Sequence, residues 1–309
     1  MESLVVGIDG GGSKTRAILA DERGETLIEA VGAGSAVKPG AAEQSAGIIA
    51  GVVRDALESA ERTDTPRVLC VGVAGVGRES ERQALWEALT THALAEEVVV
   101  QSDFEIALED AFGDGAGVLL IAGTGSSAFG RGPAGNTGRC GGWGPVVGDE
   151  GGGAWIGRRA LSVVAAAADG REPETALTGA VLTATESAEA TALIHWAAAA
   201  TPATLASLAP VVMTVADAGD LRANAIVSMA VEELALHVRA LARQLFTDER
   251  ASVPVALSGG LLRKGGPLRK RLEHRLKTAV PGAHVNAGDV DPARGAVRGA
   301  VKHLSELTA

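Results

Sequence analysis

The segment 4-LVVGIDGGGSKTRAILAD-21 decides the fold of this chain. The apolar residues 4–8 lead into three consecutive glycines, and residues 15–20 read as an outgoing strand. The turn-like sequence ERGE and another strand-like stretch, TLIEAVG, follow. The glycines are therefore predicted at the tip of a β-hairpin and not at the start of a helix.

The composition of this tip predicts a phosphate site. Ser13 separates Gly12 from Lys14, so the P-loop spacing fails by one residue, and the dinucleotide fingerprint needs a helix next. Glycine lets phosphate oxygens approach the backbone and tolerates positive φ angles. An ordinary tight turn needs only two residues, so a run of three glycines favours a bound phosphate.

Length and composition narrow the class of protein. The 309 residues suffice for two domains, and 46% hydrophobic and 21% charged residues are typical of a soluble globular protein. The net charge of −10 disfavours a nucleic-acid partner, and the basic run 263–277 is expected on the solvated face of a helix. No signal peptide and no membrane span of about 20 apolar residues is evident. We expect a cytoplasmic enzyme with no membrane partner.

The opening pattern occurs twice. The order β-β-β-α-β-α-β-α is predicted up to residue 113, and GVLLIAGTGSSAFGR (117–131) then repeats a strand, a Gly/hydroxyl turn and a second strand. Residues 153–248 are mostly helical, VPVALSGGLL (253–262) is a strand entering an SGG turn, and residues 292–307 form a terminal helix. Two related hairpin tips could hold the phosphates of one nucleotide from both sides.

These elements resemble the phosphate-1, phosphate-2 and adenosine elements of the actin-like ATPase superfamily. Within it, GIDGGGSKT, VGVAGVGR, the Ser-Asp pair at 102–103 and CGGWGPVVGDEGGGAWIGRRAL (140–161) are similar to the N-acetylglucosamine and glucosamine kinases of the BadF/BadG/BcrA/BcrD ATPase family. The resemblance implies an α/β protein with two actin-like (ribonuclease H-like) domains, a nucleotide cleft between them and a helical middle region. The implied domains are 1–114 with about 291–309, and 115–290.

The resemblance also implies an ATP site built from three turns. The implied ATP-binding residues are Gly10, Gly11, Gly12, Ser13, Lys14 and Thr15 in the first hairpin, Thr124, Gly125 and Ser126 in the second, and Ser258, Gly259 and Gly260 in the adenosine turn. Lys14 could equally be a solvated side chain. Asp9 ends a strand at the first tip, where a carboxylate beside a triphosphate suggests Mg²⁺ between them, held through water.

Asp103 is the implied general base, which would accept a proton from a sugar hydroxyl. Its position alone favours another role, the N-cap of the helix FEIALED. The implied sugar-binding residues are Ser35, Ser102, Asp103, Gly142, Trp143, Gly144 and Asp149. Trp143 could instead be a structural plug on the interdomain core.

The sugar itself stays open. Family members that prefer amino sugars carry Asn after the Ser of the loop GAGSAVKPG, where this chain has Ala36. Glucosamine, N-acetylglucosamine and N-acetylmuramic acid all remain candidates. The resemblance implies a homodimer that uses ATP and Mg²⁺.

Two other functions were weighed against the kinase. An activator ATPase would need a [4Fe–4S] cluster shared by two subunits with two Cys from each. Cys70 lies in an apolar strand and Cys140 adjoins the sugar motif, and neither is placed for such a cluster. A sugar-sensing regulator would carry a DNA-binding arm, which an acidic chain whose fold begins at residue 4 disfavours.

Overall fold

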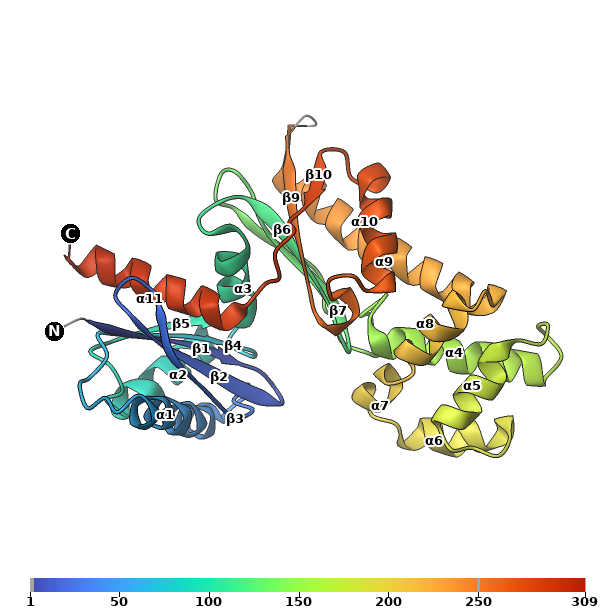
Figure 1. Cartoon of the computed structure of the whole chain (residues 1–309), viewed down its shortest axis with the longest axis horizontal. Helices are drawn as coiled ribbons and strands as arrows, with labels where there is room; N and C mark the ends of the chain where they lie inside the picture. Colours follow the sequence, from blue (N-terminus) through green and yellow to red (C-terminus); the bar gives the residue numbers. More distant parts are fainter. Residues whose placement is uncertain (1–2, 249–250, 309) are drawn as a thin grey trace. The chain divides into compact units, whose positions relative to one another are not determined.

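The computed structural model describes residues 3–248 and 251–308. The chain divides into two compact units, residues 1–115 with 290–309 and residues 116–289 (Figure 1). The first unit therefore contains both ends of the chain. The second unit is a single continuous segment.

The sheet of the first unit has the strand order β3-β2-β1-β4-β5. The strands are β1 (Leu4–Gly10), β2 (Lys14–Asp21), β3 (Thr26–Ala33), β4 (Val68–Val73) and β5 (Glu97–Ser102). β1, β2 and β3 pair antiparallel, whereas β4 and β5 run parallel to β1. The predicted hairpin and the third strand after it are confirmed.

Helices cover both faces of this sheet because its central strands are apolar on both sides. Leu4, Val6 and Ile8 pack against α1 (Ala42–Ser59) and α2 (Glu79–Thr91). Val5 faces α3 (Asp103–Phe112) and the terminal helix α11 (Pro292–Thr308) on the other side. A Cβ on Gly295 would overlap the carbonyl oxygen of Ile106, so α11 lies directly against α3.

The second unit repeats the arrangement of the first. Its sheet has the order β10-β9-β6-β7-β8. The strands are β6 (Gly117–Ala122), β7 (Ser126–Arg131), β8 (Thr137–Gly141), β9 (Val253–Ser258) and β10 (Ala283–Val285). β6, β7 and β8 are antiparallel, and β9 and β10 are parallel to β6. The second hairpin is confirmed, but the sequence analysis predicted neither β8, whose residues TGRCG lack an apolar run, nor β10, which has only three residues.

Helices fill the middle of the second unit, as predicted. They are α4 (Gly153–Ala168), α5 (Ala176–Ala184), α6 (Leu193–Ala199), α7 (Pro202–Ala206), α8 (Ala209–Asp217), α9 (Leu221–Leu245) and α10 (Pro267–Ala279), with 3-10 turns η1 (Ala190–Ala192) and η2 (Gly260–Leu262). Their apolar faces share one core with the sheet. Among the helices that the structure describes, none combines the length and the apolar character that crossing a bilayer requires.

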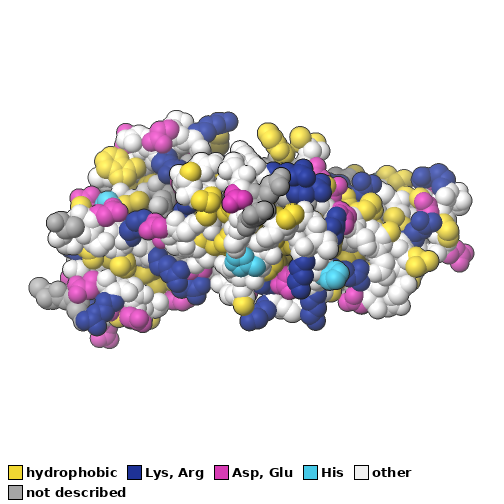
Figure 2. Space-filling model, turned by 90° about the horizontal axis from the view of Figure 1, so that it is seen from above, with side chains coloured by type: hydrophobic (Ala, Val, Ile, Leu, Met, Phe, Trp, Pro, Cys, Tyr) yellow, Lys and Arg dark blue, Asp and Glu magenta, His cyan; other side chains and the backbone are white. Residues whose placement is uncertain are grey.

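The basic run at 263–277 lies largely on α10. Figure 2 shows Lys, Arg and His side chains among the exposed residues of one face of the molecule. Lys270 and Lys277 are exposed while Leu272 and Leu276 face the core, which fits a solvated helix face. Arg269 departs from that prediction, since it is buried and donates to the backbone oxygens of Leu262 (3.2 Å) and Asn286 (3.3 Å).

Candidate active site

The first hairpin tip is open to solvent. Gly12, Ser13 and Lys14 are exposed, and Gly11 N donates to Lys14 O at 2.9 Å. The sequence analysis gave tolerance of positive φ angles as one reason for the three glycines, but none of them has a positive φ. The requirement for glycine is space at Gly10, where a Cβ would lie 2.5 Å from Ser35 Oγ.

The loop 34–37 supports this tip from beneath. Ala36 N donates to Gly11 O at 3.1 Å, and a Cβ on Gly34 would overlap Gly12 O. Thr15 Oγ1 lies 2.6 Å from Ala33 O and 2.7 Å from Ser35 Oγ. These contacts join the predicted sugar loop and the predicted phosphate hairpin into one structure.

Four hydroxyls predicted to contact ligands are instead buried. Thr15 and Ser35 bond to each other, Ser102 caps α3, and Ser126 Oγ donates to Glu150 O at 2.6 Å. The family resemblance implied these residues by their positions in the sequence, which does not show which way their hydroxyls point. In this structure they brace the loops that carry the exposed glycines and carboxylates.

The cap of α3 assigns Ser102 and Asp103 different roles. Ser102 is the N-cap: Glu105 N donates to Ser102 Oγ (3.3 Å) and Ser102 N donates to Glu105 Oε2 (2.7 Å). Asp103 is the first residue of the helix, and it is exposed. The alternative interpretation of Asp103 as the N-cap is therefore wrong.

Charged side chains gather around Asp9, which is half-buried at the end of β1. Burial raises the pKa of Asp9, and the negative charges of Asp103 and Asp291 raise it further. Lys14 and Arg16 act in the opposite direction. Asp9, the predicted magnesium ligand, and Asp103, the predicted general base, thus lie close enough for their charges to interact.

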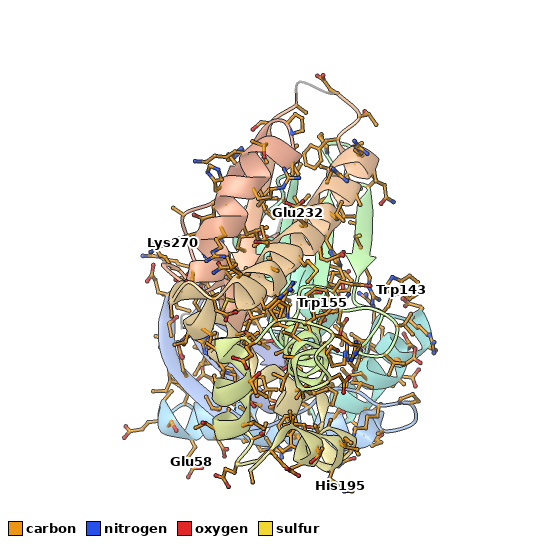
Figure 3. All side chains as sticks on the ribbon, turned by 90° about the vertical axis from the view of Figure 1, so that its right-hand side faces the viewer. Glu58, Trp143, Trp155, His195, Glu232 and Lys270 are labelled. Carbon is orange, nitrogen blue, oxygen red and sulfur yellow. The ribbon has the colours of Figure 1, made fainter. Side chains whose placement is uncertain are left out.

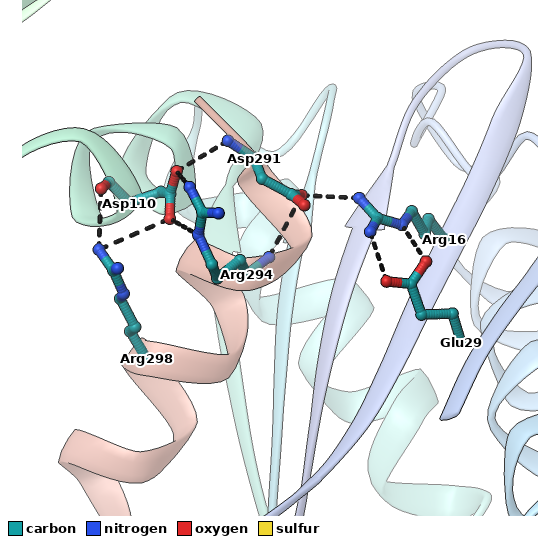
Figure 4. Close-up of polar contacts among 6 residues, drawn as sticks. All are labelled: Arg16, Glu29, Asp110, Asp291, Arg294 and Arg298. Carbon is teal, nitrogen blue, oxygen red and sulfur yellow. Dashed lines mark hydrogen bonds and ion pairs between the residues drawn. The ribbon is translucent and has the colours of Figure 1, made fainter. Parts of the chain in front are cut away.

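Sequence analysis missed Arg16 and Asp291. Arg16 lies opposite Asp9 in the pairing of β1 with β2, and its Nη1 donates to Asp291 Oδ1 at 2.7 Å (Figure 4). The hairpin pairing would have placed Arg16 beside Asp9, because the glycine tip fixes the register. Nothing local could have indicated Asp291, which lies 275 positions further along the chain.

The second tip is built into the GGWG…GDEG motif. Gly123 N donates to Gly125 O at 2.9 Å, which forms the turn and leaves Thr124 exposed. Gly153 N and Ala154 N, at the start of α4, donate to the carbonyl oxygens of Gly123 (2.8 Å) and Thr124 (2.9 Å). The start of α4 therefore holds this tip in place.

Asp149 lies against the same tip. A Cβ on Gly125 would overlap Asp149 Oδ2, and Gly144 N donates to Asp149 Oδ1 at 3.1 Å. Asp149 has a φ of 60°, a left-handed conformation that Asp tolerates better than most residues. Gly142 N donates to Ser126 O at 2.9 Å. The structure thus brings Gly142, Gly144 and Asp149 together with Thr124 and Gly125.

Trp143 projects from this loop into solvent. Its side chain is 74% exposed, whereas Trp155 on α4 is 9% exposed and stacks under Arg159, with the guanidinium 5.1 Å from the ring centre (Figure 3). Val146 and Val147 are exposed beside Trp143 in the sequence. Trp143 is therefore not a plug in the core of its own unit.

The predicted adenosine turn follows β9. Gly259 has a φ of 95°, and a Cβ there would overlap the carbonyl oxygen of Ala122. Ser258 is half-buried and Gly260 is exposed. Because β6 and β9 are parallel, this turn and the second tip lie at the same edge of the sheet, where ligands of α/β proteins bind.

The two cysteines do not suit a shared metal cluster. Cys70 is fully buried in β4, and burial raises the pKa of its thiol to about 12. Gly299 of α11 lies over it, since a Cβ there would be 3.2 Å from Cys70 Sγ. A cluster between subunits needs exposed thiolates, so Cys70 could not contribute without displacement of α11.

Comparisons with known proteins agree with this arrangement. The chain is 30% identical to an N-acetyl-D-glucosamine kinase of Dictyostelium discoideum over 96% of the chain and 97% of that protein. It is 28% identical to an N-acetylmuramic acid/N-acetylglucosamine kinase of Clostridium acetobutylicum, over 95% and 96%. A Chromobacterium violaceum structure, named as a candidate N-acetylglucosamine kinase, superposes with a TM-score of 0.77 at 31% identity, covering 96% and 98%.

The sequence pattern of one ATPase family matches residues 6–301, which include both hairpins, the adenosine turn and most of α11. The two sheets, each with three antiparallel and two parallel strands, are those of the two-domain actin-like fold. The chain belongs to the BadF/BadG/BcrA/BcrD ATPase family.

Proposed function

We propose that the protein is an ATP-dependent kinase that phosphorylates a hydroxyl group of an amino sugar. The observation that carries the proposal is the contact between Asp149 and the second hairpin tip, because a carboxylate beside a glycine turn suits our assignment of the first to sugar and the second to phosphate. Full-length relatives named as N-acetylglucosamine and N-acetylmuramic acid kinases support it. The burial of Cys70 counts against the activator ATPase.

The first unit would supply phosphate contacts and the base. The amides of Gly10–Gly12 with Ser13 and Lys14 would bind the β- and γ-phosphates, which the exposure of Gly12, Ser13 and Lys14 at the tip supports. Asp103 would take the proton from the sugar hydroxyl while the new O–P bond forms and the bond from the γ-phosphorus to ADP breaks. Asp103 is exposed and Ser102 makes the cap of α3, which supports that role.

The second unit would supply the sugar and nucleoside contacts. The carboxylate of Asp149 would accept hydrogen bonds from sugar hydroxyls, and the backbone of Gly142 and Gly144 would line the same site. The exposed Trp143 would cover the sugar ring. Thr124 and Gly125 would contact phosphate. Ser258, Gly259 and Gly260 would lie along the nucleoside.

Asp9 suits a magnesium ion held through water. Its carboxylate is a hard oxygen ligand, and a cation there would offset the repulsion that raises the pKa of Asp9. Within residues 3–248 and 251–308, no cluster of three or more His, Cys, Asp or Glu side chains could hold a metal alone. Mg²⁺ would therefore need phosphate oxygens as further ligands, and it would neutralise charge on the triphosphate.

An ADP-release assay with candidate acceptors tests the proposal. The panel contains N-acetylglucosamine, glucosamine, N-acetylmuramic acid, glucose and mannose, with a no-sugar control. We expect at least one amino sugar to raise ADP release far above the control and above both neutral hexoses. Equal release with and without every sugar would refute the kinase.

We also propose a cytoplasmic homodimer, as the family resemblance implies. The exposed side chains of Trp143, Val146 and Val147 show that apolar surface is present on the second unit. Light scattering of the purified protein should give twice the mass of the 31.1 kDa chain. A monomer mass at assay concentrations would contradict the dimer and leave the kinase proposal intact.

A further inference from the structure

We infer that Arg16 is a positioning residue of this site, a fixed counter-ion that lets the carboxylates of Asp9, Asp103 and Asp291 lie near the triphosphate. The inference rests on the proposed ATP-dependent function. Arg16 is assigned no role by the family motifs in the sequence. Its geometry on β2 carries the argument.

Arg16 and Asp9 form a directly opposed pair in the antiparallel hairpin. Such pairs point their side chains to the same face of the sheet, with Cβ atoms about 4.5–5.5 Å apart. Only 25% of the Arg16 side chain is exposed. Arg16 is therefore a partly buried cation beside the carboxylate at the base of the first tip.

Two carboxylates fix the orientation of the Arg16 guanidinium. Nε and Nη2 donate to the two oxygens of Glu29 (3.1 and 2.8 Å), and Nη1 donates to Asp291 Oδ1 (2.7 Å). A guanidinium is planar, so these contacts from two sides set its plane as well as its place (Figure 4). All three nitrogen atoms are engaged, which favours an indirect role for Arg16 over direct contact with phosphate.

Asp291 is itself held from behind. Its backbone N donates to Asp110 Oδ2 at 2.7 Å, directly before α11 begins. The carboxylate of Asp110 is almost completely buried and pairs with Arg294 at 2.6 Å and with Arg298 at 3.6 Å. The position of Arg16 is thus determined by a network that extends from β3 through β2 to α3 and α11.

The negative charges around Asp9 explain why a cation of fixed position would be needed beside it. The negative charges of Asp103 and Asp291 act on Asp9 in one direction, and the positive charges of Lys14 and Arg16 act in the other. Lys14 is exposed on the open tip, whereas Arg16 is pinned. A triphosphate brings several further negative charges, so the loss of Arg16 would weaken its binding through repulsion.

Equilibrium binding of ATP with Mg²⁺, measured without sugar, tests the inference. Arg16→Met keeps the aliphatic stem and should weaken ATP binding at least ~5-fold, the scale of losing one partly screened charge nearby. The KM for sugar should change less than twofold, and Arg16→Lys should recover at least half of the lost affinity on a logarithmic scale. Arg275→Met is the matched control, because Arg275 forms a similar pair with Glu232 (2.5 Å) on the second unit and should change nothing. Unchanged ATP affinity in Arg16→Met would overturn the inference.

Asp291→Asn separates positioning from simple charge. If Asp291 only adds negative charge, its neutralisation should tighten ATP binding. If it holds Arg16, as we infer, ATP binding should weaken despite the removal of an anion, and tighter binding would overturn the inference. This variant and Arg16→Lys decide the question even where Arg16→Met does not fold. Because no sugar is present, a wild type that binds ATP and phosphorylates no amino sugar would refute the kinase proposal separately.

Discussion

The two hairpin tips have the same strand pairing and very different surroundings. The first tip is exposed and lies among the charged side chains of Asp9, Asp103, Arg16 and Asp291. The second tip is held by backbone hydrogen bonds from the GDEG loop and α4, with Asp149 as its adjoining carboxylate. The same hairpin is thus surrounded by charged side chains in the first unit and by close backbone contacts in the second.

The largest effect is expected from a variant that removes the proposed general base of the first unit. Asp103→Asn should lower kcat at least ~10²-fold, the lower range for loss of a general base, while ATP binding is retained. Steady-state kinetics and a binding titration measure the two quantities. An unchanged kcat would remove Asp103 from the mechanism.

A smaller loss of activity is expected when the carboxylate of Asp149 in the second unit is replaced. Asp149→Asn keeps a residue that tolerates the φ of 60° and removes the charge from hydrogen bonds to sugar, so kcat/KM for sugar should fall roughly 10–10²-fold. Asp217→Asn, an exposed carboxylate near Arg271 in the same unit, serves as the control. Equal losses for ATP and sugar in Asp149→Asn would mean that the residue acts on the whole unit instead of on the sugar.

A pair of glycine substitutions compares the tips directly. In Gly125→Ala the new Cβ would overlap Asp149 Oδ2, so the carboxylate must move and the KM for sugar should rise about tenfold, since misplacement by 1 Å is costly. In Gly12→Ala the Cβ meets no atom within 4 Å, so the melting temperature should stay unchanged. Steady-state kinetics measure the KM for sugar, and thermal denaturation of both variants compares their melting temperatures. Equal destabilisation by the two would contradict the view that only the second tip is tightly packed.

The smallest expected effect concerns the cap that leaves Asp103 exposed. Burial alone would raise the pKa of Glu105, but hydrogen bonds from Ser102 and the charge of Arg82 lower it overall, below 4.5. A lowered carboxyl pKa stabilises the fold above 4.5, and this stabilisation is lost as the pH falls through the folded-state value. Ser102→Ala should therefore cost about 1 kcal/mol at pH 7 and less at pH 3, as measured by urea denaturation. A cost that stays constant with pH would contradict the coupling to Glu105.

Local patterns predicted most of the fold. The Gly-rich tip, the apolar strands and the repeated hairpin predicted the strands of the first sheet and β6, β7 and β9 of the second, because period and turn residues are local properties. The two edge strands β8 and β10 were missed, because β8 lacks an apolar pattern and β10 has only three residues. Strands of this kind are stabilised by their neighbours, which a single sequence does not display.

The site was predicted in its residue types more than in its contacts. Gly12, Asp103 and Trp143 are exposed where a ligand could reach them, whereas Thr15 and Ser35 are buried against each other. The motif gives positions along the chain, and the direction of each hydroxyl depends on packing between segments up to 24 residues apart. The bond between Arg16 and Asp291 depends on the return of the chain to the first unit.

Phosphorus-31 NMR of the reaction mixture tests the central claim most directly. With ATP, Mg²⁺ and the most active amino sugar of the panel, the spectrum should show ADP and a sugar phosphate ester appearing in equal amounts. Asp103→Asn should abolish both signals over the same period. Inorganic phosphate in place of the ester, or no change in ATP with any amino sugar, would contradict the assignment as an amino-sugar kinase.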